Sequence, residues 1–300
     1  MIKSVQELIE VCNSRNLPVW KLLLEQEMEQ TGRTAEEIYS DMEFKLQIME
    51  ESVQKGRNGV RTYSELSENG AKKISDYIEA GKSICGGPFI QAVANAVAVN
   101  EVNASMGIIC ATPTAGSAGV LPAVLMAVRD SLNLDRKDQI HFIMTAGAFG
   151  LIIANMANIS GAEGGCQAEV GSASAMAAAA LVWAAGGTVK QSADALGVAL
   201  MNVLGLVCDP VAGLVEIPCI KRNAMGAANA LASAEMVLAG VPCEIPADEV
   251  IESMGRVGRL MPAAHRETAL GGVATSKTGR EIAQRLSMKK KETLEETVNS

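Results

Sequence analysis

The chain has 300 residues, of which 48% are apolar and 20% charged, so it has ample material for a sizeable core. Its formal net charge of -8 argues against a nucleic-acid-binding surface. The seven cysteines are widely spaced and odd in number, and a chain of this length needs no disulfide framework. We therefore expect reduced thiols. Because the net charge is negative, a small anionic substrate would need a local positive site.

Residues 1–82 are rich in Glu, Lys and Arg, which indicates surface-exposed helices. Ser4 and Thr34 each stand three residues before a glutamate, the spacing of a capping box, and apolar residues follow at helical intervals. We expect short amphipathic helices that pack on the same domain as the rest of the chain. The first 16 residues lack the uninterrupted apolar stretch of a targeting peptide, so we expect a cytoplasmic protein.

Residues 83–285 form the predicted core, because between residues 83 and 128 the only charged side chain is that of Glu101. Apolar, Ala-rich segments longer than ten residues end in Gly pairs or Asn, which favours helices over strands. Alanine and glycine let helices pack closely. The predicted fold class is therefore all-α: a single compact helical catalytic domain with buried helices rich in small residues. Residues 286–300 are predicted to be a charged tail.

The segment "IHFIMTAGAFGLIIANMANI" approaches the length of a membrane-spanning helix, and membrane helices are also rich in small residues. However, it lacks basic flanks and aromatic belts, and it carries His141 and Asn155. We therefore expect a buried core helix and no membrane insertion.

The stretch "CATPTAGSAGVLPAVLMAV" at residues 110–128 indicates a tight turn that leads into a helix with Pro122 in its first turn. Gly116 lets successive N–H groups point into one concavity, to which Thr114 and Ser117 add hydroxyl groups. Such a nest binds carboxylate or phosphate. A turn that only packs helices together would have a similar composition.

Three cysteines occur at breaks between apolar helices. Cys166 lies in the glycine-rich turn "SGAEGGCQAEVG", and Cys208 and Cys219 lie in "GLVCDPVAGLVEIPCIKRNA", where two prolines interrupt helical structure. Three thiolates without a nearby histidine suit an iron–sulfur cluster or a cysteine-rich zinc site, and the lack of a C-x-x-C pair argues against a zinc finger. The remaining cysteines are predicted to be small apolar residues: Cys12, Cys85, Cys110 and Cys243.

The motifs "ISGAEGGCQAEVGSASAMAAA", "LGLVCDPVAGLVEIPCIKRNAMG", "TPTAGSAGVLPA" and "RETALGGVA" together resemble the iron–sulfur-dependent L-serine dehydratases, specifically the alpha chain of the two-subunit bacterial form. The resemblance covers essentially the whole chain. It implies an all-helical catalytic domain in which Cys166, Cys208 and Cys219 bind a [4Fe-4S] cluster with one iron free of protein thiolate.

The implied reaction is the elimination of water from L-serine to give pyruvate and ammonia, with the open iron as Lewis acid. In this interpretation Thr114, Gly116 and Ser117 hold the substrate carboxylate. Lys221, two residues after Cys219, is a candidate base for the α-proton, or else a counter-charge to the cluster.

The base that removes the α-proton could also come from another residue or from a partner chain. His141 and His265 lie outside the motifs that carry the resemblance and are expected to be structural or surface residues. The resemblance also implies a partner, the beta chain, whose histidine-containing motif completes the site. Single-chain relatives can use a C-terminal cysteine as a further cluster ligand, but no cysteine follows Cys243 here.

Two other functions fit part of the sequence. A pyridoxal phosphate β-eliminase could use "TAGSAG" as a phosphate cup, but the chain lacks alternating strands and helices and a Schiff-base lysine motif. A non-catalytic helical interaction subunit with a structural metal would explain the buried helices, but leaves the glycine nest without a purpose. The choice of serine over threonine or cysteine as substrate also stays open.

Overall fold

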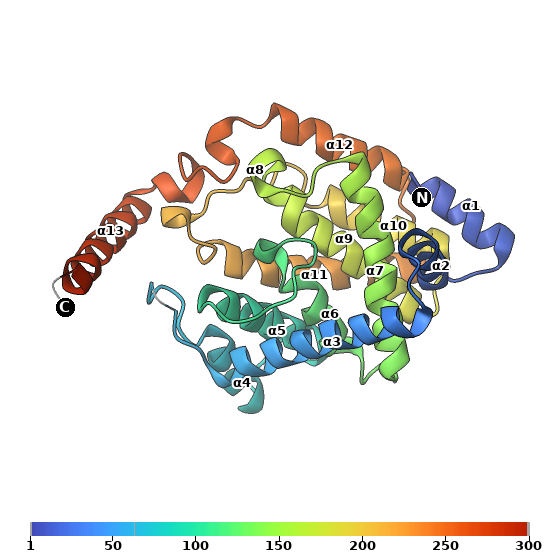
Figure 1. The fold of residues 1–300 in the computed structure, drawn as a ribbon, viewed down its shortest axis with the longest axis horizontal. Helices are drawn as coiled ribbons and strands as arrows, with labels where there is room; N and C mark the ends of the chain where they lie inside the picture. Colours follow the sequence, from blue (N-terminus) through green and yellow to red (C-terminus); the bar gives the residue numbers. More distant parts are fainter. Residues whose placement is uncertain (1, 63, 299–300) are drawn as a thin grey trace.

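The structure is a computed structural model that describes residues 2–62 and 64–298, with side chains described up to residue 290. Within these ranges the chain forms thirteen α-helices and no strand beyond one isolated backbone bridge (Figure 1). The all-α prediction is confirmed.

The helices differ widely in length, from a single turn to 24 residues. Their bounds are α1 Val5–Arg15, α2 Val19–Thr31, α3 Ala35–Asn58, α4 Gly70–Glu79, α5 Gly87–Ala104, α6 Val120–Val128, α7 Arg136–Met156, α8 Gly161–Gly164, α9 Ser172–Ala184, α10 Val189–Met201, α11 Cys219–Leu238, α12 Ala247–Leu260 and α13 Lys277–Val298. Short helical turns lie between them: η1 Ala115–Ser117, the π-helix η2 Gln167–Gly171, η3 Val211–Gly213, η4 Ala263–His265 and η5 Gly272–Thr275.

Helices α1 and α3 begin where the capping pattern predicts. The Ser4 hydroxyl accepts a hydrogen bond from the Glu7 N–H at 3.1 Å. Thr34 and Glu37 form a complete capping box, in which each side chain accepts a hydrogen bond from the other residue's N–H. At α1 the reciprocal bond is shifted by one residue, because the Glu7 carboxylate accepts from the N–H of Lys3. Side-chain acceptors thus satisfy N–H groups that have no partner within either helix.

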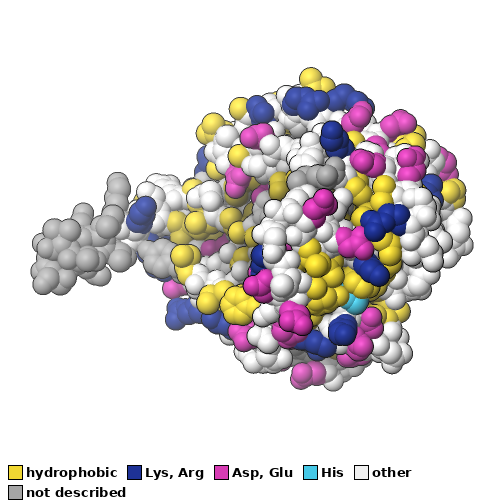
Figure 2. All heavy atoms as spheres, turned by 45° about the vertical axis from the view of Figure 1, so that its right-hand side comes forward, with side chains coloured by type: hydrophobic (Ala, Val, Ile, Leu, Met, Phe, Trp, Pro, Cys, Tyr) yellow, Lys and Arg dark blue, Asp and Glu magenta, His cyan; other side chains and the backbone are white. Residues whose placement is uncertain are grey.

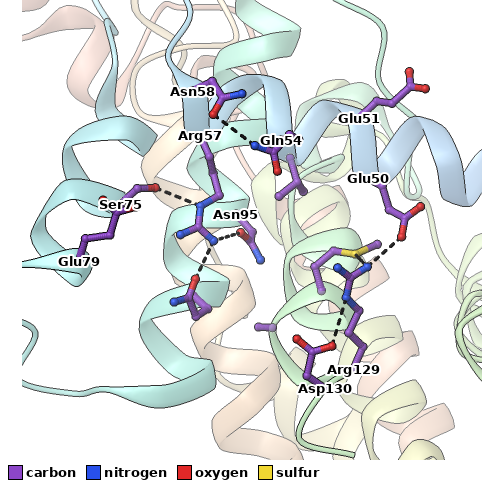
Figure 3. Close-up of a pocket in the computed structure, with 14 residues that line it drawn as sticks. Glu50, Glu51, Gln54, Arg57, Asn58, Ser75, Glu79, Asn95, Arg129 and Asp130 are labelled. Atoms are coloured by element: carbon purple, nitrogen blue, oxygen red, sulfur yellow. Dashed lines mark hydrogen bonds and ion pairs between the residues drawn. The ribbon is translucent and has the colours of Figure 1, made fainter. Parts of the chain in front are cut away.

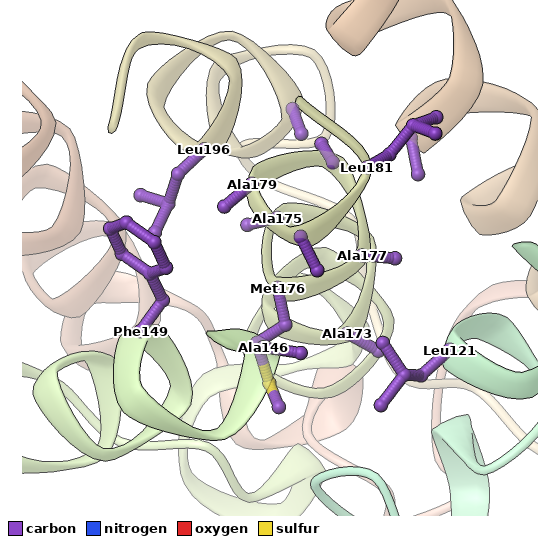
Figure 4. Close-up of a cluster of buried hydrophobic side chains, with 14 of the residues drawn as sticks. Leu121, Ala146, Phe149, Ala173, Ala175, Met176, Ala177, Ala179, Leu181 and Leu196 are labelled. Atoms are coloured by element: carbon purple, nitrogen blue, oxygen red, sulfur yellow. The ribbon is translucent and has the colours of Figure 1, made fainter. Parts of the chain in front are cut away.

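Helix α9 lies at the centre of the fold, and all its side chains from Ser172 to Val182 are buried. It packs against α6, α7, α10 and α11, and Figure 4 shows its alanines facing Leu121, Phe149 and Leu196 from these neighbours. Its small side chains allow the close approach, and the neighbours supply the volume. Buried residues of α1, α2 and α3 belong to the same apolar cluster, so the charged N-terminal part packs on this core.

Helix α7 is long and apolar enough to cross a membrane by length and composition alone. However, 61% of its most apolar 18-residue window is buried within the fold. A core helix passes the same test, and α7 packs against α2 and α9. On the face drawn in Figure 2, acidic and basic side chains are interspersed and form no extended patch of one sign.

Glu101, the single charged residue of the apolar stretch, is fully buried in α5 and caps another helix. Its carboxylate accepts hydrogen bonds from the N–H groups of Gly70 at 2.7 Å and Ala71 at 3.0 Å. These N–H groups belong to the first turn of α4, where helical partners are absent and negative charge is favoured. Hydrogen bonds from the start of α4 therefore stabilise the buried carboxylate of Glu101.

Helix α13 projects from the body of the molecule (Figure 1) and packs mainly on η3 and η5. Lys289 on this helix forms an ion pair with Glu65 at 3.1 Å. The predicted charged tail, residues 286–300, continues α13 as far as Val298, and residues 299–300 lie outside the described part.

Candidate functional site

Cys166, Cys208 and Cys219, here called the thiol site, lie at three breaks of the helical chain. Cys166 immediately precedes the π-helix, Cys208 lies in the extended segment after α10, and Cys219 is the first residue of α11. Their residues are 2%, 3% and 7% exposed, and all three are free thiols. The structure thus confirms that the three cysteines lie at breaks between helices. It also shows that their side chains are buried, which a position in a surface turn would not require.

The three thiols act on one another. A hydrogen bond from Cys208 and then the positive charge of Arg222 lower the pKa of Cys166. The same hydrogen bond, followed by burial, raises the pKa of Cys208 well above its usual range, and burial raises that of Cys219 to about 12. Any thiolate charge in the thiol site is therefore favoured at Cys166.

The backbone of Cys208 is fixed by His265 and the segment "RETALGGVA" that follows it. Its N–H donates to the carbonyl of His265 at 2.8 Å, and its carbonyl accepts from the N–H of Glu267 at 2.9 Å. Asp209 then accepts from the N–H of Val273 at 2.7 Å. Gly272 has a φ of +56°, and a Cβ there would lie 2.0 Å from the Asp209 carboxylate, so only glycine fits.

Arg222 is the cation of the thiol site. Its guanidinium forms an ion pair with buried Asp209 at 2.8 Å and donates to the carbonyl of Val207 at 2.6 Å. Burial opposes its charge, but the negative charges of Cys166 and Asp209 outweigh burial and raise the pKa of Arg222. The arginine is thus held in place as a positive charge beside the thiols.

Lys221, the predicted base, is exposed on α11. The helical repeat explains the difference from Arg222: a residue three positions after Cys219 lies on the same face of α11, whereas one two positions after it points away. The catalytic role of Lys221 stays a prediction.

Glu169 lies in the π-helix, between the thiol site and the loop of residues 112–119, here called the nest loop. Its carboxylate accepts hydrogen bonds from the Thr114 side chain and from the N–H of Gly161, and burial raises its pKa. A Cβ on Gly161 would lie 2.6 Å from this carboxylate and 3.3 Å from the Cys208 sulfur. A Cβ on Gly116 would lie 3.3 Å from the carboxylate oxygens. The two glycines therefore leave the space that Glu169 occupies, and π-helical turns are frequent at functional sites.

The nest loop is anchored by α11 and by α5, whose Asn103 side chain donates to the carbonyl of Ala115 at 3.2 Å. The Asn223 side chain donates to the carbonyl of Gly116 at 2.7 Å and accepts from the N–H of Gly119 at 3.1 Å. The hydroxyl groups of Thr114 and Ser117 lie 3.1 Å apart. Ser117 is fully buried, and its hydroxyl forms hydrogen bonds within the loop. Of the three predicted binding residues, Thr114 and Gly116 are therefore the two that lie beside Glu169.

The N–H groups of Ala115 and Gly116 in the nest loop have no acceptor in the described part of the chain. They are successive residues at the start of a helical turn, so an anion held there would satisfy both groups. The structure thus keeps the predicted nest open at these two positions.

The described residues contain no group of three His, Cys, Asp or Glu side chains arranged to hold a single metal ion. An iron–sulfur cluster is several times larger than one ion, so its ligands need not converge on one point. Thiolates are the ligands such clusters use, Arg222 supplies a compensating charge, and Gly161 leaves room beside Cys208. The chemistry of this donor set fits a cluster.

The histidines occupy different environments. His141 is buried in α7, stacks on Trp20 with ring centroids 3.6 Å apart, and is bonded to the Tyr39 hydroxyl at 2.7 Å. His265 lies in η4, and its backbone carbonyl supports Cys208. The His141 ring thus has structural contacts, whereas the buried Nδ1 of His265 has no hydrogen-bond partner among the described residues.

The sequence pattern had pointed to the thiols and the nest loop but not to the groups that surround them: Glu169, Asp209, Arg222 and Asn223. The signal for two of them was present, because Arg222 and Asn223 follow Cys219 by three and four residues on one helix face. Asp209 and Glu169 carried no such signal, since their partners come from distant segments.

Residues 14–274 match the family model described as serine dehydratase alpha chain. The chain belongs to this family. It is 54% identical over 286 residues to the probable L-serine dehydratase alpha chain of Bacillus subtilis, covering 95% of each chain. It is 47% identical over 284 residues to the L-serine dehydratase alpha chain of Peptoniphilus asaccharolyticus, covering 94% of this chain and 97% of that protein.

A longer member is also similar. The L-serine dehydratase of Mycobacterium tuberculosis is 38% identical over 280 residues, which cover 90% of this chain and 60% of that protein. The resemblance drawn from the four sequence motifs is therefore confirmed at the level of the family.

Proposed function

We propose that this chain is the alpha chain of an L-serine dehydratase, a lyase that eliminates water from L-serine to give pyruvate and ammonia. The observation that carries the proposal is the meeting of the thiol site, Arg222 and Glu169 with the nest loop. The two alpha-chain relatives, at 54% and 47% identity over nearly the whole chain, support the same reaction.

The cofactor we propose is a [4Fe-4S] cluster held by Cys166, Cys208 and Cys219. When bound, it supplies an open iron as Lewis acid for the serine hydroxyl, which is otherwise a poor leaving group. Arg222 offsets negative charge on the thiolates, and Asp209 holds Arg222 in position. Free thiols suit the reducing cytoplasm, where we propose that the enzyme works.

The nest loop and Glu169 present complementary charges to the two ends of L-serine. The free N–H groups of Ala115 and Gly116 suit the substrate carboxylate. Glu169 suits the ammonium group, because a nearby cation stabilises the ionised form of a buried carboxyl. Thr114 donates to Glu169 and so links the two binding groups, while Ser117 maintains the shape of the loop.

A base must remove the α-proton, and we propose that the beta chain supplies it in an alpha–beta heterodimer. Lys221 is exposed, whereas the thiols are buried. The relatives of Bacillus subtilis and Peptoniphilus asaccharolyticus are named alpha chains, which implies a partner chain. Loss of a general base costs about 10²–10⁴-fold in rate. We expect Lys221→Met to lower activity of the assembled enzyme by less than tenfold, and a loss of about 100-fold or more would assign the base to Lys221.

The cofactor proposal is tested by anaerobic co-purification with the beta chain, followed by iron, sulfide and pyruvate-formation assays. We expect Cys166→Ala to lose iron, sulfide and activity together. Cys243→Ala is the matched control, because Cys243 is also buried but its thiol donates to the carbonyl of Ile245, away from the thiol site. Full iron and sulfide in Cys166→Ala would refute the ligand assignment. Zinc without activity in the wild type would favour a structural-metal subunit.

A further inference from the structure

A separate polar cavity lies between α3, α4, α5 and α6. Its volume is about 780 Å³, and no residue of the thiol site or the nest loop lines it. Figure 3 shows Arg57 extending from α3 into this cavity, toward Ser75 of α4 and Asn95 of α5. Neither the family motifs nor the proposed reaction uses these residues.

Among the residues that the structure describes, only neutral side chains accept hydrogen bonds from the Arg57 guanidinium. Nε donates to the Ser75 hydroxyl at 3.0 Å, and Nη1 donates to the side-chain oxygens of Gln91 at 2.6 Å and Asn95 at 3.2 Å. These three acceptors fix the plane of the guanidinium without neutralising it. Burial accordingly lowers the pKa of Arg57, an effect that the charge of Glu79 partly opposes.

One edge of this guanidinium is unused. Among the described residues, Nη2 of Arg57 donates to no protein acceptor, and no carboxylate lies within 4.0 Å of the side chain. Nη2 retains some exposure to solvent, and Arg57 lines the cavity. An oriented arginine with free N–H groups is suited to a carboxylate.

Acidic side chains line the outer part of the cavity. Glu79 lies close enough to influence Arg57, and Glu51 and Asp130 also contribute to the lining. In the described part of the chain, Glu79 and Glu51 form no ion pair. A simple anion would be repelled by these carboxylates, whereas an ammonium group would be attracted. Arg129 also lines the cavity, but it is paired with Glu50 and Asp130. Among the described residues that line it, the cavity therefore combines one unpaired cation, Arg57, with a border that carries the unpaired carboxylates of Glu79 and Glu51.

We propose that this cavity binds a small α-amino acid, with its carboxylate on Nη2 of Arg57 and its ammonium group facing Glu79. An α-amino acid carries one negative and one positive group, and the described lining of the cavity offers an unpaired guanidinium for the first and the unpaired Glu79 carboxylate for the second. Because Glu79 is exposed, its contribution is smaller than that of Arg57.

The cavity is connected to the nest loop through α5. Asn95 lines the cavity, and Asn103 near the other end of α5 donates to the carbonyl of Ala115 at 3.2 Å. Helices α3 and α5 are in close contact, since a Cβ on Gly56 would lie 2.3 Å from the carbonyl oxygen of Ala98. An amino acid bound at Arg57 therefore contacts the helix that supports the nest loop.

Calorimetric titration of the isolated chain with L-alanine tests the proposal. L-alanine has both charges but no hydroxyl to eliminate, so its binding does not depend on the lyase reaction. We expect Arg57→Gln to weaken binding at least tenfold and Glu79→Gln by about two- to fivefold. Arg61→Gln is the control, because Arg61 is exposed and its ion pairs within the described ranges are with Glu65 and Glu68. Propionate, which lacks the ammonium group, should bind more weakly than L-alanine.

Three outcomes would overturn the proposal: no binding of L-alanine, equal binding of propionate, or binding that Arg57→Gln leaves intact while Glu169→Gln abolishes it. The last outcome would place the amino acid at the nest loop. Glu79→Gln tests the same site with less risk to folding than Arg57→Gln, because no described hydrogen bond uses the Glu79 carboxylate. Weaker binding by Glu79→Gln would therefore support the site even if Arg57→Gln failed to fold. The proposed lyase reaction is tested separately, by iron content and pyruvate formation, so its failure and the failure of amino-acid binding at Arg57 can be distinguished.

Discussion

Asp209 and Arg222 form an ion pair at 2.8 Å, in which the Asp209 side chain is 2% exposed and that of Arg222 16%. The pair joins the segment after α10 to the first turn of α11, and so links the backbone around Cys208 to that of Cys219. Asp209 also accepts from the N–H of Val273, which ties the same point to η5. One carboxylate thus holds together three segments that surround the thiol site.

Asp209→Asn should therefore destabilise the protein. Removing one charge of a buried pair leaves the other uncompensated, which costs about 3–5 kcal/mol. Urea denaturation of the isolated chain measures the loss. Asp130→Asn is the control, since the Asp130 side chain is 94% exposed, and its change should stay within about 0.5 kcal/mol. A similar small effect for both variants would contradict the role given to Asp209.

Glu101→Gln should lower stability and loosen the start of α4. The amide retains one acceptor but loses the charge that the N–H groups of Gly70 and Ala71 share, and hydrogen bonds to charged groups contribute about 1.5–3 kcal/mol each. Hydrogen exchange should accelerate at these two amides. Glu68→Gln is the control, because the Glu68 side chain is half-buried and pairs with exposed Arg61. Unchanged exchange in Glu101→Gln would rule out the capping role.

The His141 environment predicts a pH dependence of stability. Burial lowers the pKa of His141 below its usual value of 6.5, so protonation costs more in the folded than in the unfolded protein. Its contribution is fully present above pH 6.5 and is lost as the pH falls toward the lowered pKa. Nearby Asp135 and Asp138 reduce the effect, and Lys137 adds to it.

His141→Gln removes this titration and keeps an acceptor for the Tyr39 hydroxyl. The variant should be less stable at neutral pH, because the stacking on Trp20 is lost. Its melting temperature should also fall less steeply than that of the wild type between about pH 6.5 and pH 5. His265→Gln serves as control, and parallel curves for wild type and His141→Gln would exclude His141 as the source.

Gly161→Ala should impair cofactor binding without removing a ligand. A Cβ at this position would lie 2.6 Å from the Glu169 carboxylate and 3.3 Å from the Cys208 sulfur, so one of the two groups must move. We expect lower iron content after anaerobic reconstitution. Gly147→Ala is the matched control, because its Cβ would make an ordinary contact at 3.7 Å with Leu23. Normal iron content in Gly161→Ala would show that the space beside Cys208 is not needed.

Local sequence signals were sufficient for the fold class and for several helix ends. Alanine-rich segments predicted the buried helix α9, and the serine and threonine capping patterns predicted the starts of α1 and α3. Such features depend on residues within a few positions of each other, so the sequence displays them directly. The nest loop and the three thiols were also visible, because glycines and prolines mark breaks in helices.

Only the tertiary structure decided which charged groups meet. Glu101 caps a helix that begins 31 residues earlier in the chain, and Glu169 lies against both Gly161 and Gly116. Asp209 and Arg222 are 13 residues apart but belong to different segments, and Arg57 lies among side chains of α4 and α5. The helical repeat determines which side of its own helix a residue occupies, but helix packing determines which group it faces and how much water remains between them.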